Sequence, residues 1–383
     1  MPSDPLDGSA GEAALPERLG LAHKAETDAI VELPRWRGAI QASAIAAYTF
    51  AGLFLFVLAL QLLKGGAGGL KPVLKALDVH GPVNTLGFGW LGAYTVMSGS
   101  PVAAISLSLF SKGTLSDIEA FAMINGSRLG ASFIVLFVGF IQYLMHRRTA
   151  DGLFIGVVAL LVAFTLWLPV LPIGILVLKA GWFDSIRLGT PPGITSIINV
   201  VYDPIVRRID DHLPALAMFG IGIGVLLLAF AVFDRALPNL EQPSLKVERV
   251  KEWLHHPLAM FALGLAITAV TMSVSLSVTL LIPLSLKGYV RRSNIIPYVM
   301  GANISTWVDT LIAALLLNSP RAFTIVFTEM AVGGYVSLVV LLFAYKPYSN
   351  AILSLARRIT QTRRGFALFL GAILLVPAIL FLV

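Results

Sequence analysis

The chain has 383 residues, of which 57% are hydrophobic and only 13% are charged, and its mean hydropathy is +0.84. Soluble domains carry about 25% charged residues, so this composition excludes a soluble globular protein and predicts an integral membrane protein. The net charge of +7 comes without a basic face or an aromatic stacking motif, which argues against a nucleic-acid partner. The chain has no cysteine, which excludes thiol chemistry.

Residues 1–38 hold no continuous apolar core and are interpreted as a polar cytoplasmic tail, not as a signal peptide. Seven later segments are apolar and long enough to cross a bilayer as helices, which argues against an outer-membrane barrel. They are residues 40–63, 118–145, 153–177, 213–234, 294–317, 323–345 and 366–383. We expect an external linker at 178–212, a basic cytoplasmic loop at 346–365 and an extra transmembrane helix at 366–383.

Two regions, 64–113 and 239–288, are too long for loops and too interrupted by glycine, proline and serine for one clean span. We interpret each as a re-entrant helical hairpin that enters the membrane and leaves on the side from which it came. Irregular backbone at that depth is tolerated only where protein or a water-filled cavity surrounds it.

An internal repeat connects the two hairpins. Residues 97–113 recur in degenerate form at 272–288, with Met, Ser, Ser, Leu, Lys and Gly in register. The same offset of 175 positions maps the first three spans approximately onto the next three. The predicted fold is therefore an all-α polytopic membrane protein with two repeats, 39–177 and 213–345, each containing a re-entrant hairpin and broken helices.

The orientation of the repeats follows from their number of spans. Three crossings per repeat is an odd number, so the second repeat must be inverted relative to the first. Lysine and arginine are more frequent in the loops that a cytoplasmic N-terminus would place inside. We therefore expect a multi-pass protein of the plasma (inner) membrane with a cytoplasmic N-terminus.

Two motif pairs resemble a known family. MSGS at 97–100 precedes NGSRLGAS at 125–132, and MSVS at 272–275 precedes MGANISTW at 300–307. This arrangement resembles the type II sodium/phosphate cotransporter family, in which a Gln-Ser-Ser-Ser motif precedes a Gly-Ala-Asn-Ile-Gly-Thr motif in each half. The resemblance covers about residues 45–345 and lies in order, spacing and duplication more than in identity. It implies that serine-rich hairpin tips bind phosphate and that neighbouring oxygens bind sodium.

The hairpin serines have a role that physical chemistry predicts independently. A broken helix directs unpaired N–H groups and the positive end of its dipole into the gap, and hydroxyls add donors that suit an oxyanion. The plainer alternative is that these serines only bond to the backbone or allow close helix packing. The candidate substrate residues on the hairpins are Ser98, Ser100, Ser273 and Ser275. The resemblance adds Asn303 for the substrate, and Asn125, Ser305, Thr306 and Asp309 for a cation.

Arg128 occupies the position of the family's asparagine in the first repeat. An arginine inside an apolar span is costly, so it predicts a function and a partner. Three interpretations remain open: Arg128 clamps an anionic substrate, pairs with Asp309 (the one acid well inside a matching helix), or replaces a sodium ion. Snorkelling to the membrane surface is the plainer alternative. Met97 and Met272 replace the family's glutamine, which favours a larger, partly apolar anion.

These observations predict a secondary active transporter that moves phosphate or a related anion by alternating access, coupled to sodium. Proton coupling, or a sodium-independent transporter of a phosphorylated organic or lipid substrate, is the first alternative. A membrane scaffold that has lost transport is the second alternative. Catalytic and metal-binding motifs are lacking in the sequence, so we expect no enzyme activity and no cofactor beyond a coupling sodium ion. The expected partners are a small anion and membrane lipids, and a homo-oligomer remains open.

Overall fold

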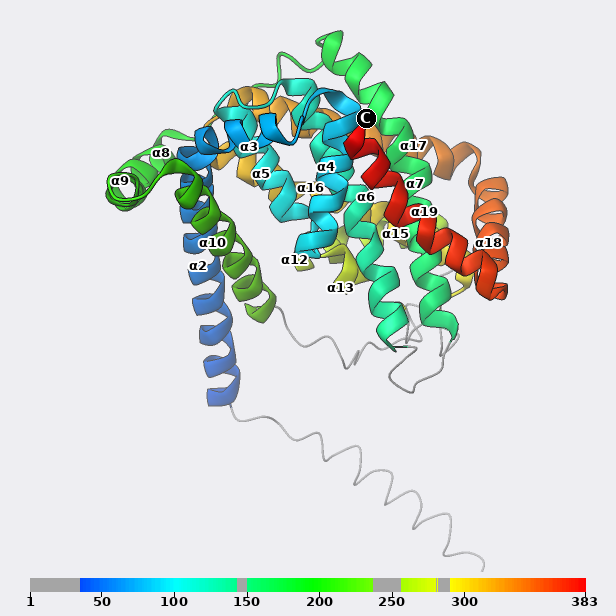
Figure 1. Cartoon of the computed structure of the whole chain (residues 1–383). Coiled ribbons are helices and arrows are strands. Elements are labelled where there is room, and N and C mark those ends of the chain that lie inside the picture. Colours follow the sequence, from blue (N-terminus) through cyan, green and yellow to red (C-terminus); the bar gives the residue numbers. More distant parts are fainter. Residues whose placement is uncertain (1–34, 143–149, 237–255, 280, 282–289) are drawn as a thin grey trace, which may run out of the picture.

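The computed structural model describes residues 35–142, 150–236, 256–279, 281 and 290–383, and within these ranges every regular element is a helix (Figure 1). Among the described residues, seven helical segments are long and apolar enough to cross a membrane, and they overlap the seven predicted spans. The prediction of an all-α, multi-pass membrane protein is confirmed as far as helix content, helix length and apolar composition are concerned.

The elements, in chain order, have the following bounds. The first group comprises α2 (Arg35–Gly66), the 3₁₀ turn η1 (Ala67–Leu70), α3 (Lys71–Ala76), α4 (Gly81–Val96), α5 (Gly99–Ser111), α6 (Asp117–Gln142) and α7 (Ala150–Lys179). The second group comprises α8 (Pro192–Ile197), the π-helical turn η3 (Ile198–Tyr202), α9 (Asp203–Asp210), α10 (Ala215–Ala236), α12 (Pro257–Thr271) and α13 (Val274–Thr279). The last group comprises α15 (Arg292–Ser305), α16 (Trp307–Leu316), α17 (Pro320–Phe343), α18 (Tyr345–Gln361) and α19 (Arg363–Leu382).

Residues 346–365 are not the loop that the sequence suggested, because most of them form helix α18. Its buried residues are three or four positions apart, namely Ser349, Ile352, Ala356 and Ile359. That spacing gives one apolar face, which packs near α7, and leaves the basic residues on the other face. The expected linker 178–212 also contains helical turns, α8 to α9. The expected tail lies outside the described residues up to position 34, as do residues 239–255, 280 and 282–288 of the second hairpin region.

Helix α4 runs beside α6 in the same direction. Its first residue, Gly81, donates its N–H to Oε1 of Glu119 at the start of α6, at 2.9 Å. Further along, Gly126 of α6 lies so close to Leu86 that an added Cβ would be 2.0 Å from the Leu86 carbonyl oxygen. A glycine is therefore required for this close helix approach.

Helix α5 then returns along α6 in the opposite direction. Its first residue, Gly99, packs against Ser127, near the midpoint of α6. Ser106 donates its hydroxyl to the carbonyl of Ala120 at 3.1 Å, close to the start of α6. The pair α4–α5 thus begins and ends at the end of the bundle where α6 begins, and turns midway along α6. We call this end of the bundle the Asp117 end.

The turn after α4 has a counterpart after α12. Met97 (φ 55°) and Met272 (φ 49°) both adopt the left-handed conformation and follow the last residue of a helix. The Met97 N–H bonds to the carbonyl of Ala93, and the Met272 N–H bonds to the carbonyl of Thr268. Met97 and Met272 are 175 positions apart, and so are Ala93 and Thr268, which is the offset that the sequence predicted.

The close approach between α4 and α6 also recurs at the same offset, between α12 and α15. A Cβ added at Gly126 would lie 2.0 Å from the Leu86 carbonyl oxygen, and one added at Gly301 would lie 2.0 Å from the Phe261 carbonyl oxygen. Two helix pairs from different parts of the chain therefore pack through the same backbone contact.

Helices α2 and α10, which the offset also relates, pack against each other antiparallel at one side of the bundle (Figure 1). Gly52 of α2 lies against Phe233, and Gly66 lies against Phe219. Helix α19 packs antiparallel on α4. Tyr94 donates its hydroxyl to the carbonyl of Ile373 at 2.7 Å, which is midway along α19.

Candidate functional site

The centre of the site is a break in the long segment from Arg292 to Leu316. Thr306 separates α15 from α16, and its backbone N–H bonds to the carbonyl of Ile304, not to one four residues back. The break leaves the Thr306 carbonyl available for a side chain and starts α16 near the middle of the span. Asp309, in the first turn of α16, is 5% exposed.

Arg128, near the midpoint of α6, is 7% exposed and occupies this break. Its Nη2 lies 3.8 Å from Oδ1 of Asp309 and donates to the Thr306 carbonyl at 3.2 Å. The same nitrogen donates to the Thr310 hydroxyl at 2.7 Å, and Thr310 donates to Asp309 at 2.8 Å. The predicted pairing of Arg128 with Asp309 is therefore present, and snorkelling is not the conformation observed.

Two tryptophans form one wall of the site. The guanidinium carbon of Arg128 lies 4.1 Å from the ring centroid of Trp307, which is cation–π geometry. The Trp307 ring in turn contacts Trp167 of α7, with centroids 5.4 Å apart. Asn125, one turn before Arg128 on α6, donates its amide to the Trp167 carbonyl at 3.2 Å. The sequence analysis did not identify either tryptophan.

A second buried acid, Glu329, belongs to the same site and contradicts the expectation that Asp309 is alone. It lies near the middle of α17 and is 0% exposed. Arg128 and Asn125 are the neighbours that interact with its carboxylate. The signal that could have identified Glu329 was present in the sequence, because an acid well inside an apolar span is a functional candidate by default.

Buried polar atoms without hydrogen-bond partners are concentrated here. Among the described residues ten such side-chain atoms occur, and eight of them belong to this group. They are Asn125 Oδ1, Arg128 Nε, Asn303 Nδ2, Ser305 Oγ, Trp307 Nε1, Asp309 Oδ2 and both carboxylate oxygens of Glu329. Buried polar groups are normally paired, so a cluster of unpaired donors and acceptors indicates a place for a ligand, an ion, a proton or water.

The predicted hairpin serines lie at the two turns. Ser98 precedes α5 in an extended conformation, and the Ser100 hydroxyl, in the first turn of α5, interacts with the Asp309 carboxylate. Ser273 lies between α12 and α13, and Ser275 lies in α13, but the Ser275 side chain is outside the described residues. Both α5 and α13 pack against α6. Ser100 is thus the hairpin serine that the structure brings to the Arg128–Asp309 pair.

The cation candidates lie on both sides of the break. Thr306 donates its hydroxyl to the carbonyl of Asn303 at 2.9 Å, while Ser305 and Asn303 keep side-chain atoms unpaired. No group of three or more His, Cys, Asp or Glu side chains that could hold a metal ion occurs among the described residues.

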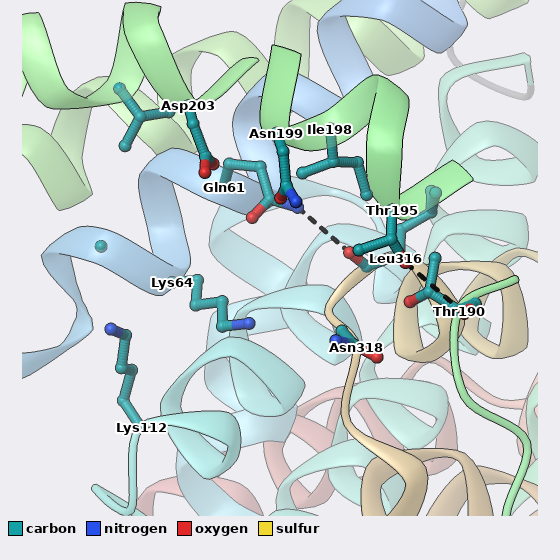
Figure 2. Close-up of a pocket in the computed structure, with 12 residues that line it drawn as sticks. Gln61, Lys64, Lys112, Thr190, Thr195, Ile198, Asn199, Asp203, Leu316 and Asn318 are labelled. Carbon is teal, nitrogen blue, oxygen red and sulfur yellow. Dashed lines mark hydrogen bonds between the residues drawn. The ribbon is translucent and has the colours of Figure 1, made fainter. Parts of the chain in front are cut away.

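A separate cavity of about 290 Å³ lies at the Asp117 end, between the ends of α2, α5 and α16 and the segment 190–206 (Figure 2). Lys64 donates to the carbonyl of Leu317 at 2.7 Å, and Gln61 donates to the carbonyl of Leu316 at 3.0 Å. These bonds cap the C-terminal end of α16. Lys112, at the end of α5, lines the same cavity, which begins about 10 Å along α16 from Asp309 at the usual helical rise.

Comparison of the chain with protein-family models, with curated proteins and with solved structures finds no match.

Proposed function

We propose that this protein is a secondary active transporter that moves phosphate or a related small anion by alternating access, together with a coupling cation. The observation that carries the proposal is the group of eight unpartnered buried polar atoms around the α15–α16 break. These atoms lie near the midpoints of helices that are long enough to span a membrane. Unpaired donors and acceptors at that depth mark substrate and ion pathways in membrane proteins.

The architecture that we propose is two inverted repeats. Support comes from the glycine contacts of Gly126 and Gly301, which recur at the offset of 175 positions. The antiparallel packing of α2 against α10 is a second support, because a twofold axis in the membrane plane would exchange these two helices. We place the N-terminus in the cytoplasm, which puts the Asp117 end outside the plasma (inner) membrane.

In this arrangement α4–α5 is a re-entrant hairpin that enters from the outside, and α12–α13 begins a hairpin that enters from the cytoplasm. The return of α5 along α6, with its turn against Ser127, supports the first hairpin. The left-handed turns at Met97 and Met272 support the equivalence of the two. Broken helices at mid-depth bring helix N-termini and free carbonyls to the substrate, as other inverted-repeat transporters do.

The anion is assigned to the donors of the site. The first-turn N–H groups of α5, the Ser100 hydroxyl and the Arg128 guanidinium are the groups that an oxyanion would use. A bound anion would compete with Asp309 for Arg128. Binding of the anion is therefore linked to separation of the Arg128–Asp309 pair. Phosphate is the named candidate because of the resemblance to the type II sodium/phosphate cotransporters. Lys64 and Lys112 would attract the anion to the outer cavity.

The coupling cation is assigned to the acceptors. Asp309 Oδ2 and Ser305 Oγ have no donor, so they are available to a small cation. Sodium is the ion that the family resemblance suggests.

The decisive experiment is uptake of labelled phosphate by the full-length protein in proteoliposomes, with and without an inward sodium gradient. We expect sodium-stimulated uptake that Arg128→Gln abolishes and that Lys75→Gln, a change at an exposed position of α3, leaves intact. Uptake without sodium stimulation would support a sodium-independent carrier. Folded protein that moves neither phosphate nor an organic phosphate, and whose thermal midpoint phosphate does not raise, would contradict the proposal and favour a scaffold.

A further inference from the structure

Glu329 is the carboxylate of the site on which neither oxygen accepts a hydrogen bond, and its polar neighbours are Arg128 and Asn125. It lies midway along α17 and is fully buried. An ionised carboxylate without donors in an apolar interior is strongly disfavoured relative to the neutral acid. The surroundings of Glu329 must therefore either supply a positive charge or hold a proton.

The nearest positive charge is already committed. Arg128 is shared with Asp309, the Thr306 carbonyl and the Thr310 hydroxyl. One guanidinium cannot neutralise two carboxylates, so the cluster Arg128, Asp309 and Glu329 carries one uncompensated negative charge when both acids are ionised. A proton on Glu329 removes that imbalance.

The polar neighbour of Glu329 fits a neutral carboxyl. Asn125 donates one of its two amide N–H groups to the Trp167 carbonyl, and its Oδ1 is buried without a donor. A protonated carboxyl has one O–H, which is the donor that Asn125 Oδ1 lacks. We infer that Glu329 is a proton-binding site whose neutral form donates a hydrogen bond to Asn125, and that it binds this proton more tightly when an anion occupies Arg128.

The second half of this inference rests on the proposed transport function. An anion at Arg128 adds negative charge to the cluster, and proton uptake by Glu329 compensates for one unit of it. A sodium ion would fit the position beside Glu329 less well than a proton, because Asn125 contributes only one oxygen to the surroundings of Glu329.

Other titratable groups on neighbouring elements do not compete for this role. The hydroxyl of Tyr298, on α15, is bonded to Ser277, and that of Tyr348, on α18, is bonded to Thr165. On α17 itself, Arg321 lies at the Asp117 end and pairs with Asp117 and Asp184. Of the described charged groups, Arg128 on α6 is therefore the one that interacts with Glu329.

The test uses infrared spectroscopy of the purified full-length protein in lipid nanodiscs, titrated over pH in H₂O and D₂O. A protonated buried carboxyl gives an isolated C=O stretching band that shifts in D₂O. We expect this band at neutral pH in the wild type and its loss in Glu329→Gln. In Asp309→Asn, Arg128 is free to pair with Glu329, so the band should disappear at neutral pH and return on acidification, whereas a band of Asp309 would be absent at every pH. Asn125→Ala should move the band to higher frequency, because the hydrogen bond from Glu329 is lost.

Several outcomes would overturn the inference: no such band in the wild type at neutral pH, a band unchanged in Glu329→Gln, or a band that sodium ions remove. The Asn125→Ala shift decides the assignment even if Glu329→Gln does not fold. Calorimetric titration with inorganic phosphate, at the pH at which half of the wild-type band is lost and in buffers of different ionisation enthalpy, then measures proton uptake. Phosphate binding without proton uptake would refute the coupling, whereas a Glu329 band without phosphate binding would refute the transport proposal and leave the proton site.

Discussion

Nη2 of Arg128 and Oδ1 of Asp309 lie 3.8 Å apart, and both side chains are buried. The pair connects the midpoint of α6 to the first turn of α16, across the two parts of the chain that share the 97–113 and 272–288 repeat. The attraction between the charges must offset the loss of hydration of both groups, which is only feasible with additional donors and acceptors. Thr306 and Thr310 supply these.

Removal of one member of this pair should be more harmful than removal of both. Arg128→Gln or Asp309→Asn leaves an uncompensated buried charge, and we expect each to lower the free energy of unfolding by about 3–5 kcal/mol. The double variant should be less destabilised than the sum of the two single variants. Unfolding in detergent, followed by tryptophan fluorescence, measures these differences.

The matched control is Arg321→Gln, because Arg321 pairs with Asp117 and Asp184 while remaining 30% exposed. A partly solvated ion pair contributes about 1 kcal/mol or less. Additive effects in the Arg128 and Asp309 cycle would show that the two groups do not interact in the folded protein.

Gly126 and Gly301 should be equally intolerant of alanine. Alanine at either position would place its Cβ 2.0 Å from a backbone carbonyl oxygen of the neighbouring helix. The two helices of that pair must therefore separate to accept the methyl group. We expect Gly126→Ala and Gly301→Ala each to cost about 1–3 kcal/mol in the free energy of unfolding. In Gly334→Ala, where no heavy atom lies within 4 Å, the reduced chain entropy of alanine should stabilise by up to about 1 kcal/mol. Tolerance at one of the two paired glycines would argue against equivalent packing.

Much of the fold could be predicted because it depends on local composition. The seven spans are continuous apolar runs. The breaks after α4 and α12 follow from the serine-containing motif that is repeated at 97–113 and 272–288. The partnership of Arg128 and Asp309 could also be predicted, because a buried arginine needs an acid and few are available within the spans. Helix α18 was missed because its amphipathic pattern is shorter than a span and its basic residues suggested a loop.

The rest of the site depends on packing that no short motif records. Trp307 becomes a platform for Arg128 only because the α15–α16 break turns its ring toward α6 and α7. Glu329 joins the site because α17 packs against α6 and α7, and neither neighbour is close to it in sequence. The left-handed turn at Met97 and Met272 could not be anticipated either, since methionine is uncommon in that conformation.

Replacement of Met97 by glycine should be better tolerated than replacement by alanine. The left-handed conformation costs a non-glycine residue about 1–2 kcal/mol, and glycine removes that cost, whereas both variants lose the same burial of a residue that is 38% exposed. Met97→Ala is the matched control, because it removes the same side chain but keeps the strain. We expect the free energy of unfolding of Met97→Gly to exceed that of Met97→Ala by about 1 kcal/mol. We expect Met272→Gly to exceed Met272→Ala in the same way. Equal stabilities of the two variants would mean that the turn relaxes in the membrane.

Ser100→Ala tests the contact between the first hairpin and the Arg128–Asp309 pair. The change removes one hydroxyl that reaches Asp309, so we expect phosphate affinity to fall by about threefold to tenfold, the value of one hydrogen bond. The phosphate-dependent rise of the thermal midpoint measures this affinity, and expression should be unaffected. Ser196→Ala, in the exposed helix α8, is the control because its hydroxyl bonds only to the carbonyl of Pro192 among the described contacts. Unchanged affinity in Ser100→Ala would remove this serine from the site.

Lys112→Gln tests the outer cavity as the entrance for the anion. Lys112, Lys64 and Asp203 line one cavity, so its lining carries a net positive charge that should raise the local concentration of an anion. We expect Lys112→Gln to raise the KM for phosphate uptake by about threefold or more, with little change in the maximal rate, and the effect should shrink at high salt. Lys75→Gln removes an equal charge from an exposed position on α3 and should leave the KM unchanged. If both variants raise the KM equally, general surface charge attracts the anion, and the cavity between α2, α5 and α16 is not its entrance.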